Sequence, residues 1–445
     1  MTITRQGFSQ VLGFAFSGMR FPAQAPHVVY PLGMFIPGSD LAPLKEMLDE
    51  LVSGLTAWKP KKQAERVSLP TSIMVQGSDY EDALAKTNVY FLKRLWSDGL
   101  PIVPPTRSRV AALMRGTDLP ADKVMARIMP RGGSVTVETL AANLAMAGGR
   151  PEYMPVLIAA VEAITAPAFH HELMNPTTCS NYPVVIVNGP VARQIRLASG
   201  YGCLGPDPVH PAGASIGRAI RFLLQGAGGA VPGKGTMSIF GGPARYTNIV
   251  FAEDEDGIPP DWQPLSVEQG FPCGANAATA YTVASTTNIV GGDAGIAQSA
   301  LETLGRAAAF MAVPSRNYFG NPHNPEGAAG ILIIARATAQ GLSQLGWSKD
   351  KVKAYLWERA KITPSLIYSS RHSGARNPGE GPLPVSLSPK GIKIVVAGGA
   401  QSGHMMWMQV GVGSEKLTSA EIKLPRAWDT LLAKAEEDLG PLPEP

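Results

Sequence analysis

The chain of 445 residues is long enough for two or three domains or for one large α/β enzyme. Hydrophobic residues make up 45% and charged residues 17% of the sequence, which favours a compact soluble protein with a substantial core and excludes a disordered chain. The net charge of +4 is spread along the chain, and the densest basic cluster (59–66) contains Glu65 and lacks interleaved aromatic residues. A nucleic-acid partner is therefore not expected.

The cysteines argue against a disulfide framework. Cys179, Cys203 and Cys273 are odd in number and show no CxxC spacing, which favours a reducing, cytoplasmic setting. The N-terminal segment superficially resembles a secretion signal, but Arg20 interrupts it and Pro26 would follow the cleavage site, so we expect it to stay in the mature chain. No run approaches the roughly 18 apolar residues of a membrane span, and no membrane partner is expected.

The first third of the chain is expected to be mainly helical. Residues 1–90 are predicted to form an N-terminal arm or helical lobe, because apolar residues recur at helical spacing in 41–55 and 80–96. LPIVPPT (100–106) is predicted as a short strand that its double proline ends. Further helices are predicted at 107–116, 135–149 and 152–166. The last of these is nearly apolar all round and therefore buried.

From residue 184 onward, strands and helices alternate. Strands are predicted at 184–190, 245–256, 278–290 and 330–335, and 392–404 is predicted as a strand that runs into a glycine turn; helices are predicted at 216–229, 295–312 and 349–361. Such alternation is typical of an α/β architecture with parallel strand pairing. We therefore predict an α/β fold of two lobes behind the helical arm. The first lobe covers 91–295 and carries most of the site, and the second covers 296–445.

The stretch SGYGCLGPDPVHPAGASIGR (199–218) runs from a glycine-rich loop into a helix. Ser215 is expected to cap that helix, whose free N–H groups and dipole favour an anion. Arg218 in its first turns opposes the dipole, a placement that a carboxylate or phosphate ligand would offset. The alternative, that Arg218 points to solvent or pairs with an acidic neighbour, stays open. The predicted substrate-binding residues are Ser199, Tyr201, Cys203, Ser215, Arg218 and Arg245.

Two segments resemble familiar motifs but lack the spacing or the structural context that those motifs require. GGAVPGKGT (228–236) has the composition of a P-loop, but Gly235 follows Lys234 and no helix begins there, so no nucleotide cofactor is expected. The segment 213–217 matches GxSxG literally, but a proline-rich loop precedes it in place of a strand. A nucleophile elbow is therefore not expected.

Several residues are candidates for metal binding or for acid and base catalysis. His171 and Cys179 suit zinc or iron, but neither HExxH nor CxxC spacing is present, so a divalent metal stays an open alternative. The histidines at 170 and 171 fit better as a helix-end pair that contacts backbone carbonyls, and Cys179 is also compatible with a small buried residue. Glu253 and Glu268 are candidate bases, although the acid run at 253–256 is of a kind usually solvated. The predicted catalytic residues are Cys179, His171, Glu253, Glu268 and His404.

Six segments between roughly residues 80 and 430 resemble the large proteins associated with the UGSC-type (seleno)protein family. They are WSDGLPIVPPT (96–106), 135–163, PVVIVNGP (183–190), 199–224, 244–271 and GWSKDKVKAYLWERA (346–360). In that family a small flavodoxin-like domain, fused behind or encoded beside the large one, carries a U/C-Gly-Ser-Cys motif. This chain has no such motif. The resemblance therefore implies a separate small thiol or selenol partner protein.

The chain also departs from its apparent relatives at single positions. Those relatives tend to carry His where this sequence has Cys179, an exchange that a metal ligand or a nucleophile position tolerates. They also tend to carry His where Gly327 follows Pro-Glu, which implies a diverged substrate. The segment 213–218 keeps the hydroxyl, the glycine and the arginine of the corresponding motif.

Together these features predict an enzyme, or the large subunit of one, that acts on a small organic acid or carbonyl compound. Thiol-dependent bond cleavage or reduction, completed by the small partner protein, fits the resemblance. Two alternatives stay open: a self-contained lyase or hydrolase, with or without a metal, and a non-catalytic substrate-binding or scaffold subunit. A homo- or hetero-oligomer is expected.

Overall fold

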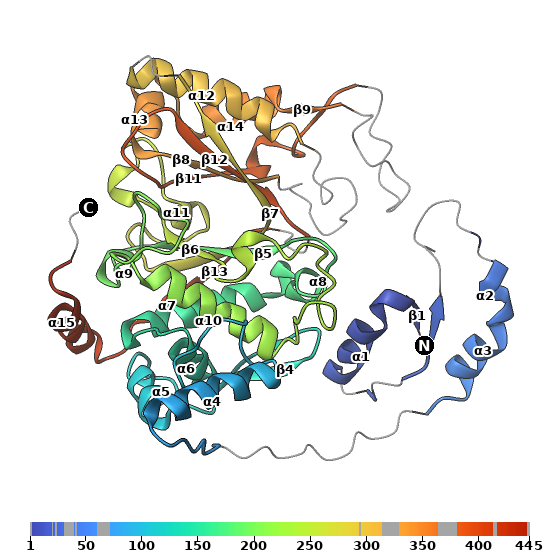
Figure 1. The fold of residues 1–445 in the computed structure, drawn as a ribbon. Coiled ribbons are helices and arrows are strands. Elements are labelled where there is room, and N and C mark those ends of the chain that lie inside the picture. The colour runs from blue at the N-terminus through green and yellow to red at the C-terminus, as the bar shows by residue number, and fades with distance from the viewer. Residues whose placement is uncertain are drawn as a thin grey trace.

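The computed structural model describes residues 2–19, 21–22, 25–30, 40, 42–59, 72–292, 295–313, 329–363, 381–412 and 416–442. The protein is a mixed α/β fold in which helices surround one curled sheet (Figure 1). The predicted α/β class is thus confirmed. Two segments singled out in the sequence, the basic cluster beyond Lys59 and the Pro325–Gly327 departure, lie outside the described residues.

The central sheet has the strand order β11-β8-β12-β7-β5-β6, with β13 also paired to β7. Its strands are β5 (Tyr182–Asn188), β6 (Ile249–Ala252), β7 (Ala277–Val290), β8 (Gly330–Ile334), β11 (Ile392–Val396), β12 (His404–Val410) and β13 (Thr418–Glu421). The long strand β7 pairs with β5 over its first half and with β12 over its second half. One continuous sheet therefore includes strands from both predicted lobes, and the boundary near residue 295 stays a prediction.

The prediction of parallel pairing is wrong for much of this sheet. The pairs β11·β8 and β5·β6 are parallel, but β12 is antiparallel to both β8 and β7, and β7 is antiparallel to β5. The turn at 397–403 explains one reversal, because a parallel return needs a crossover of a dozen or more residues. The chain instead leaves β11 and re-enters the sheet at once as β12.

Helices cover the outer faces of the sheet, and β5, β6 and β8 are buried on both sides. The helices α6 (Val137–Met146), α7 (Met154–Thr165) and α10 (Ala212–Gly226) share one hydrophobic cluster with β5, and α12 (Ile296–Met311), α13 (Arg336–Gln344) and α14 (Lys349–Arg359) share another with β8, β11 and β12. The opposite faces of the strands meet inside the curl, where Ile186 of β5 and Ile333 of β8 belong to one cluster. Burial on both faces explains why these strands are continuous apolar runs in the sequence.

The remaining elements differ from expectation mostly at their boundaries. The helix expected over 41–55 is divided into two, and the expected strand at 100–106 is absent from this fully described segment. The other elements are β1 (Thr2–Arg5), α1 (Ser9–Gly18), β2 (His27–Tyr30), α2 (Ala42–Glu46), α3 (Leu48–Thr56), α4 (Tyr80–Lys93), α5 (Arg107–Met114), β3 (Val124–Ile128), β4 (Gly133–Thr136), α8 (His171–Met174), α9 (Val191–Gln194), α11 (Leu265–Glu268), β9 (Lys361–Ile362), β10 (Leu383–Pro384) and α15 (Trp428–Leu439).

Helix α7 is almost entirely apolar. Among the described helices none is by itself long and apolar enough to cross a membrane, although Pro151–Thr165 and Pro167–Met174 pass that test as a bent pair. Ten residues of α7 are buried, and they contribute to the cluster that α6 and α10 share.

Candidate functional site

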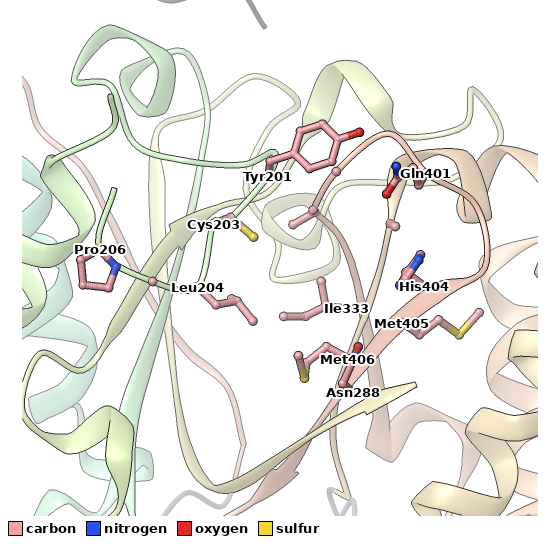
Figure 2. Close-up of a pocket in the computed structure, with 16 residues that line it drawn as sticks. Tyr201, Cys203, Leu204, Pro206, Asn288, Ile333, Gln401, His404, Met405 and Met406 are labelled. Atoms are coloured by element: carbon pink, nitrogen blue, oxygen red, sulfur yellow. The ribbon is translucent and has the colours of Figure 1, made fainter. Parts of the chain in front are cut away.

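A cavity of about 540 Å³ lies at the carboxyl ends of β8 and β11. Figure 2 shows the 201–206 loop on one side of it and Gln401, His404 and Met406 on the other. Asn288 near the end of β7 and Ile333 of β8 complete the lining between them. The rule that ligands bind at the carboxyl ends of α/β strands therefore selects a real hollow in this fold.

The glycine turn after β11 fits closely against the 201–206 loop. The N–H of Gly398 donates a 2.7 Å hydrogen bond to the carbonyl oxygen of Ser199, which places this predicted binding residue beside the cavity. A Cβ atom at Gly399 would lie 2.1 Å from the ring of Tyr201, so only glycine permits this approach. The backbone angle φ of Gly398 is +106°, which also favours glycine.

The floor of the cavity is apolar and its rim is polar. Ile333, Ala397 and Cys203 are buried and belong to the cluster inside the curled sheet. At the rim, Tyr201 is 64% exposed and His404 is exposed as the first residue of β12. No lysine, arginine, aspartate or glutamate is among the described residues that line it. The cavity is therefore suited to a ligand with an apolar body and neutral polar groups.

The backbone of His404 is held on both sides. Its N–H donates to Oγ1 of Thr338 at 3.2 Å, and its carbonyl oxygen accepts from the N–H of Ala335, also at 3.2 Å. Both contacts come from the segment that follows β8. They fix the point at which the imidazole enters the cavity rim.

Cys203 is a buried thiol rather than a reactive thiolate. Burial raises the pKa of Cys203 from 9.0 to about 12, and Asp254 adds to the effect. The group therefore stays protonated at neutral pH, and its role in the floor is that of a small apolar side chain.

The start of α10 does not form the expected anion cradle. The helix begins at Ala212, and Ser215 lies inside it, where its N–H donates to the carbonyl oxygen of Pro211. The prediction that Ser215 caps the helix is therefore wrong. Arg218 donates to both carboxylate oxygens of Asp98, at 2.8 and 3.0 Å, and to the carbonyl oxygen of Pro101 at 2.9 Å. The structure thus favours the alternative that Arg218 pairs with an acidic neighbour over the prediction that it binds an anionic ligand.

His171 and Cys179 do not reach the cavity lining. His171 is buried, and its Nε2 accepts a 3.2 Å hydrogen bond from the N–H of Met129. Burial lowers the pKa of His171, so the ring is neutral at pH 7. Cys179 is half-buried, and its N–H donates to Oγ1 of Thr177. Within the described parts of the chain, no three His, Cys, Asp or Glu residues are grouped so that they could hold a metal ion.

The first two acids of the run after β6 are buried, contrary to the expectation that the run is solvated, whereas Glu255 is half-buried and Asp256 is exposed. Glu253 is 4% and Asp254 5% exposed. Glu253 accepts from Asn188 Nδ2 at 2.8 Å, from the N–H of Leu265 at 2.6 Å and from the N–H of Val396 at 3.4 Å. Burial raises the pKa of Glu253, and these donors and Lys349 only partly offset it. The Glu253 side chain thus links the ends of β5 and β11 to the start of α11, and it does not line the cavity.

Asp254 and Glu268 are likewise held by cations. Both oxygens of Asp254 accept from Arg336 at the start of α13, each at 2.6 Å. The carboxylate of Glu268 lies 2.6 Å from Lys349 Nζ and 2.8 Å from Lys353 Nζ. Burial alone would raise the pKa of Glu268, but the two ammonium groups outweigh it and hold the pKa below its usual range. Neither acid lines the cavity.

Arg245 lies in a second, smaller pocket together with Arg221. Of the predicted site residues, the structure therefore brings Tyr201, Cys203 and His404 to the main cavity, with Ser199 beside it. Sequence analysis missed Asn288, Gln401 and Met406. A signal for Gln401 was present, since it lies within the predicted glycine turn, whereas Asn288 and Met406 depend on how β7 and β12 pair.

No protein-family model, curated protein or solved structure matches this chain. The resemblance to the UGSC-associated proteins therefore stays a prediction, as do the partner protein and the metal. The function is argued below from the site alone.

Proposed function

We propose that this protein is an enzyme, or the large subunit of one, that binds a small neutral carbonyl compound in the cavity beside β12. The observation that carries the proposal is that Tyr201 and His404 line the rim of one cavity with an apolar floor, from two different segments. Its volume of about 540 Å³ lies within the ordinary range of small-molecule sites.

The lining favours a carbonyl compound over an organic acid. A carboxylate taken out of water needs a cation or several N–H donors, and the described lining provides no lysine or arginine. A carbonyl oxygen needs only one or two donors. The Tyr201 hydroxyl, the His404 imidazole and the side-chain amides of Asn288 and Gln401 are groups of that kind.

The burial of Cys203 in the cavity floor supports a role for a thiol from outside the cavity. Cys203 stays protonated because burial raises its pKa to about 12, so a thiolate nucleophile has to come from elsewhere. When the thiolate of a partner adds to the carbonyl carbon, a carbon–sulfur bond forms and the carbonyl π pair moves to oxygen. A proton from His404 or Tyr201 then neutralises the alkoxide and gives a hemithioacetal.

Binding is tested with two probes of similar size and different charge, acetophenone and benzoate. We expect acetophenone to raise the Tm of the full chain and benzoate to leave it unchanged. His404→Gln should weaken the acetophenone response, whereas Gln298→Ala, on the exposed side of α12, should keep it. A response to benzoate as large as that to acetophenone would contradict the neutral-ligand assignment.

Catalysis is tested with benzaldehyde and 2-mercaptoethanol, which replaces the partner thiol. We expect the wild-type chain to accelerate hemithioacetal formation, measured by stopped-flow absorbance, and His404→Gln to lower that acceleration by about 100-fold, as for the loss of a general acid. Gln298→Ala is again the control. Acetophenone binding without any acceleration would reject the proposal of an enzyme and favour the alternative of a substrate-binding subunit.

A further inference from the structure

The second pocket, of about 150 Å³, is lined by α10 and by the 232–246 segment. The polar residues that line it are Asp98, Arg221, Thr236, Ser238, Arg245 and Tyr246. Two consecutive glycines, Gly241 and Gly242, form part of its wall, and both have positive φ angles. The pocket thus combines three elements that are distant in the sequence: the loop after α4, the middle of α10 and the segment before β6.

Two guanidinium groups are buried in this pocket. Arg221 and Arg245 are each only 8% exposed. Nη1 of Arg221 donates to the carbonyl oxygen of Ala230 at 3.3 Å. Nη2 of Arg245 donates to the carbonyl oxygen of Asn175 at 3.1 Å and to Oγ1 of Thr236 at 3.0 Å. These bonds fix both side chains, so each guanidinium is presented in a defined orientation.

Two polar atoms of the pocket are left without partners. Nη1 of Arg245 and Oγ of Ser238 are both buried, and neither forms a hydrogen bond to any residue that the structure describes. A buried N–H of a charged group without an acceptor is costly, and native proteins rarely leave one so. Both atoms belong to residues that line the pocket, so a single bound acceptor can satisfy them.

The charges of the pocket do not balance. Its one carboxylate, Asp98, already accepts two hydrogen bonds from Arg218. No described carboxylate forms an ion pair with Arg221 or Arg245. Burial and the nearby Arg221 lower the pKa of Arg245 to about 10, which shows how unfavourable an uncompensated charge is at this position. Arg221 and Arg245 thus add two positive charges to a pocket whose one described carboxylate is already paired with Arg218.

We propose that this pocket binds a small divalent oxyanion of the phosphate type. The oxyanion accepts from Nη1 of Arg245 and Oγ of Ser238, and the charge of Arg221 completes its neutralisation. Guanidinium forks match the spacing of phosphate oxygens, and two of them match its charge. The volume admits a phosphate group but is far below that of the main cavity, so a whole nucleotide does not fit. The proposal is independent of the chemistry at His404.

The test is isothermal titration of the full chain with inorganic phosphate at constant ionic strength. We expect one saturable site per chain. Arg245→Met should weaken it by about tenfold or more, since a charge-assisted hydrogen bond and a full charge are lost. Ser238→Ala, which removes only a hydroxyl, should weaken it by about fivefold. Arg426→Met, at a side chain that is 95% exposed, is the matched control and should bind as the wild type does.

The proposal is overturned if phosphate gives no saturable heat, or if folded Arg245→Met binds it as the wild type does. Circular dichroism checks folding, and Ser238→Ala keeps the test decisive should Arg245→Met not fold. Phenyl phosphate separates two sources of the anion. Affinity equal to that of inorganic phosphate assigns the site to the phosphate group of an ester, and clearly weaker affinity assigns it to the free ion.

Discussion

The cavity around His404 and the pocket around Arg245 belong to one chain but are lined by different chemistry. The cavity has an apolar floor with neutral polar groups on an exposed rim, whereas the pocket holds two buried guanidinium groups around little volume. A ligand in the first gains mainly from burial of its apolar surface, and a ligand in the second from charge neutralisation. The two hollows should therefore respond to different ligands, different variants and different salt concentrations.

The largest contrast expected within the cavity concerns Cys203. At pH 8 a pKa of about 12 in place of 9.0 lowers the thiolate fraction about 1000-fold. Iodoacetamide should therefore modify Cys203 far more slowly than the exposed Cys273, which is the internal reference. Mass spectrometry of the digested protein measures both rates. Comparable rates would show that the cavity floor carries a reactive thiolate and is not neutral.

For the pocket, the largest effect is expected from Asp98→Asn. The side chains of Asp98 and Arg218 are 2% and 17% exposed, and removal of one partner of such a buried pair costs about 3 kcal/mol. The change should lower the free energy of unfolding in urea by that amount, and phosphate should restore part of it. Asp118→Asn, whose partner Arg426 is exposed, should leave stability unchanged. Equal stability of the two variants would reject an unbalanced positive pocket.

A substitution that fills the cavity should weaken ligand binding there and leave ligand binding in the second pocket unchanged. Met406 faces the cavity from β12, and Met406→Trp should occupy part of the space that acetophenone needs. We expect its affinity to fall about tenfold, since the loss of the buried apolar contacts of a small ligand is worth about 1.4 kcal/mol. Phosphate binding, measured by titration, should not change. A parallel loss of phosphate binding would show that the two sites are coupled.

The smallest effect is expected on the pH dependence of stability, through Glu253. Its carboxylate accepts from the N–H of Val396, just before the glycine turn that lines the cavity. A carboxyl whose pKa is raised on folding binds more protons folded than unfolded, so its contribution to stability decreases as pH rises above 4.5 toward the folded value. Glu253→Gln should remove this decrease in a series of Tm measurements between about pH 4 and pH 8. Glu268, whose pKa is lowered, contributes stability above 4.5 that is lost on acidification. Glu268→Gln should therefore change the profile in the opposite sense, and like effects of the two would contradict this assignment.

The elements that the sequence predicted well are those with a strong local pattern. The run VVIVN predicts β5 because a strand buried on both faces is apolar throughout, and α12 follows from helical spacing. β12 was missed, since HMMWMQV does not alternate and lies just beyond the glycine turn. The direction of β7 and β12 was missed as well, because strand pairing depends on distant segments that a local pattern does not contain.

The site shows the same limit. Tyr201, Cys203 and His404 were found because the glycine-rich loop before α10 and the glycine turn after β11 are visible in the sequence. The partner of Arg218 was not, since Asp98 lies 120 positions earlier and carries no motif of its own. Likewise, the burial of Glu253 after β6 depends on its donors in β5 and β11. Charge pairing of this kind is a property of the fold and not of the local sequence.

A backbone hydrogen bond just after β6 also affects how the sheet edges can interact with other copies of the protein. β6 and β11 are the two edge strands of the sheet path, and the N–H of Asp254 donates a 2.8 Å hydrogen bond to the carbonyl oxygen of Val396 at the end of β11. Edge strands with free backbone groups recruit strands from neighbouring molecules and lead to aggregation. In this fold the curl brings the two edges together at Asp254 and Val396. At this point the two edges bond to each other, and neither this N–H nor this carbonyl group is free to pair with a strand of a neighbouring molecule.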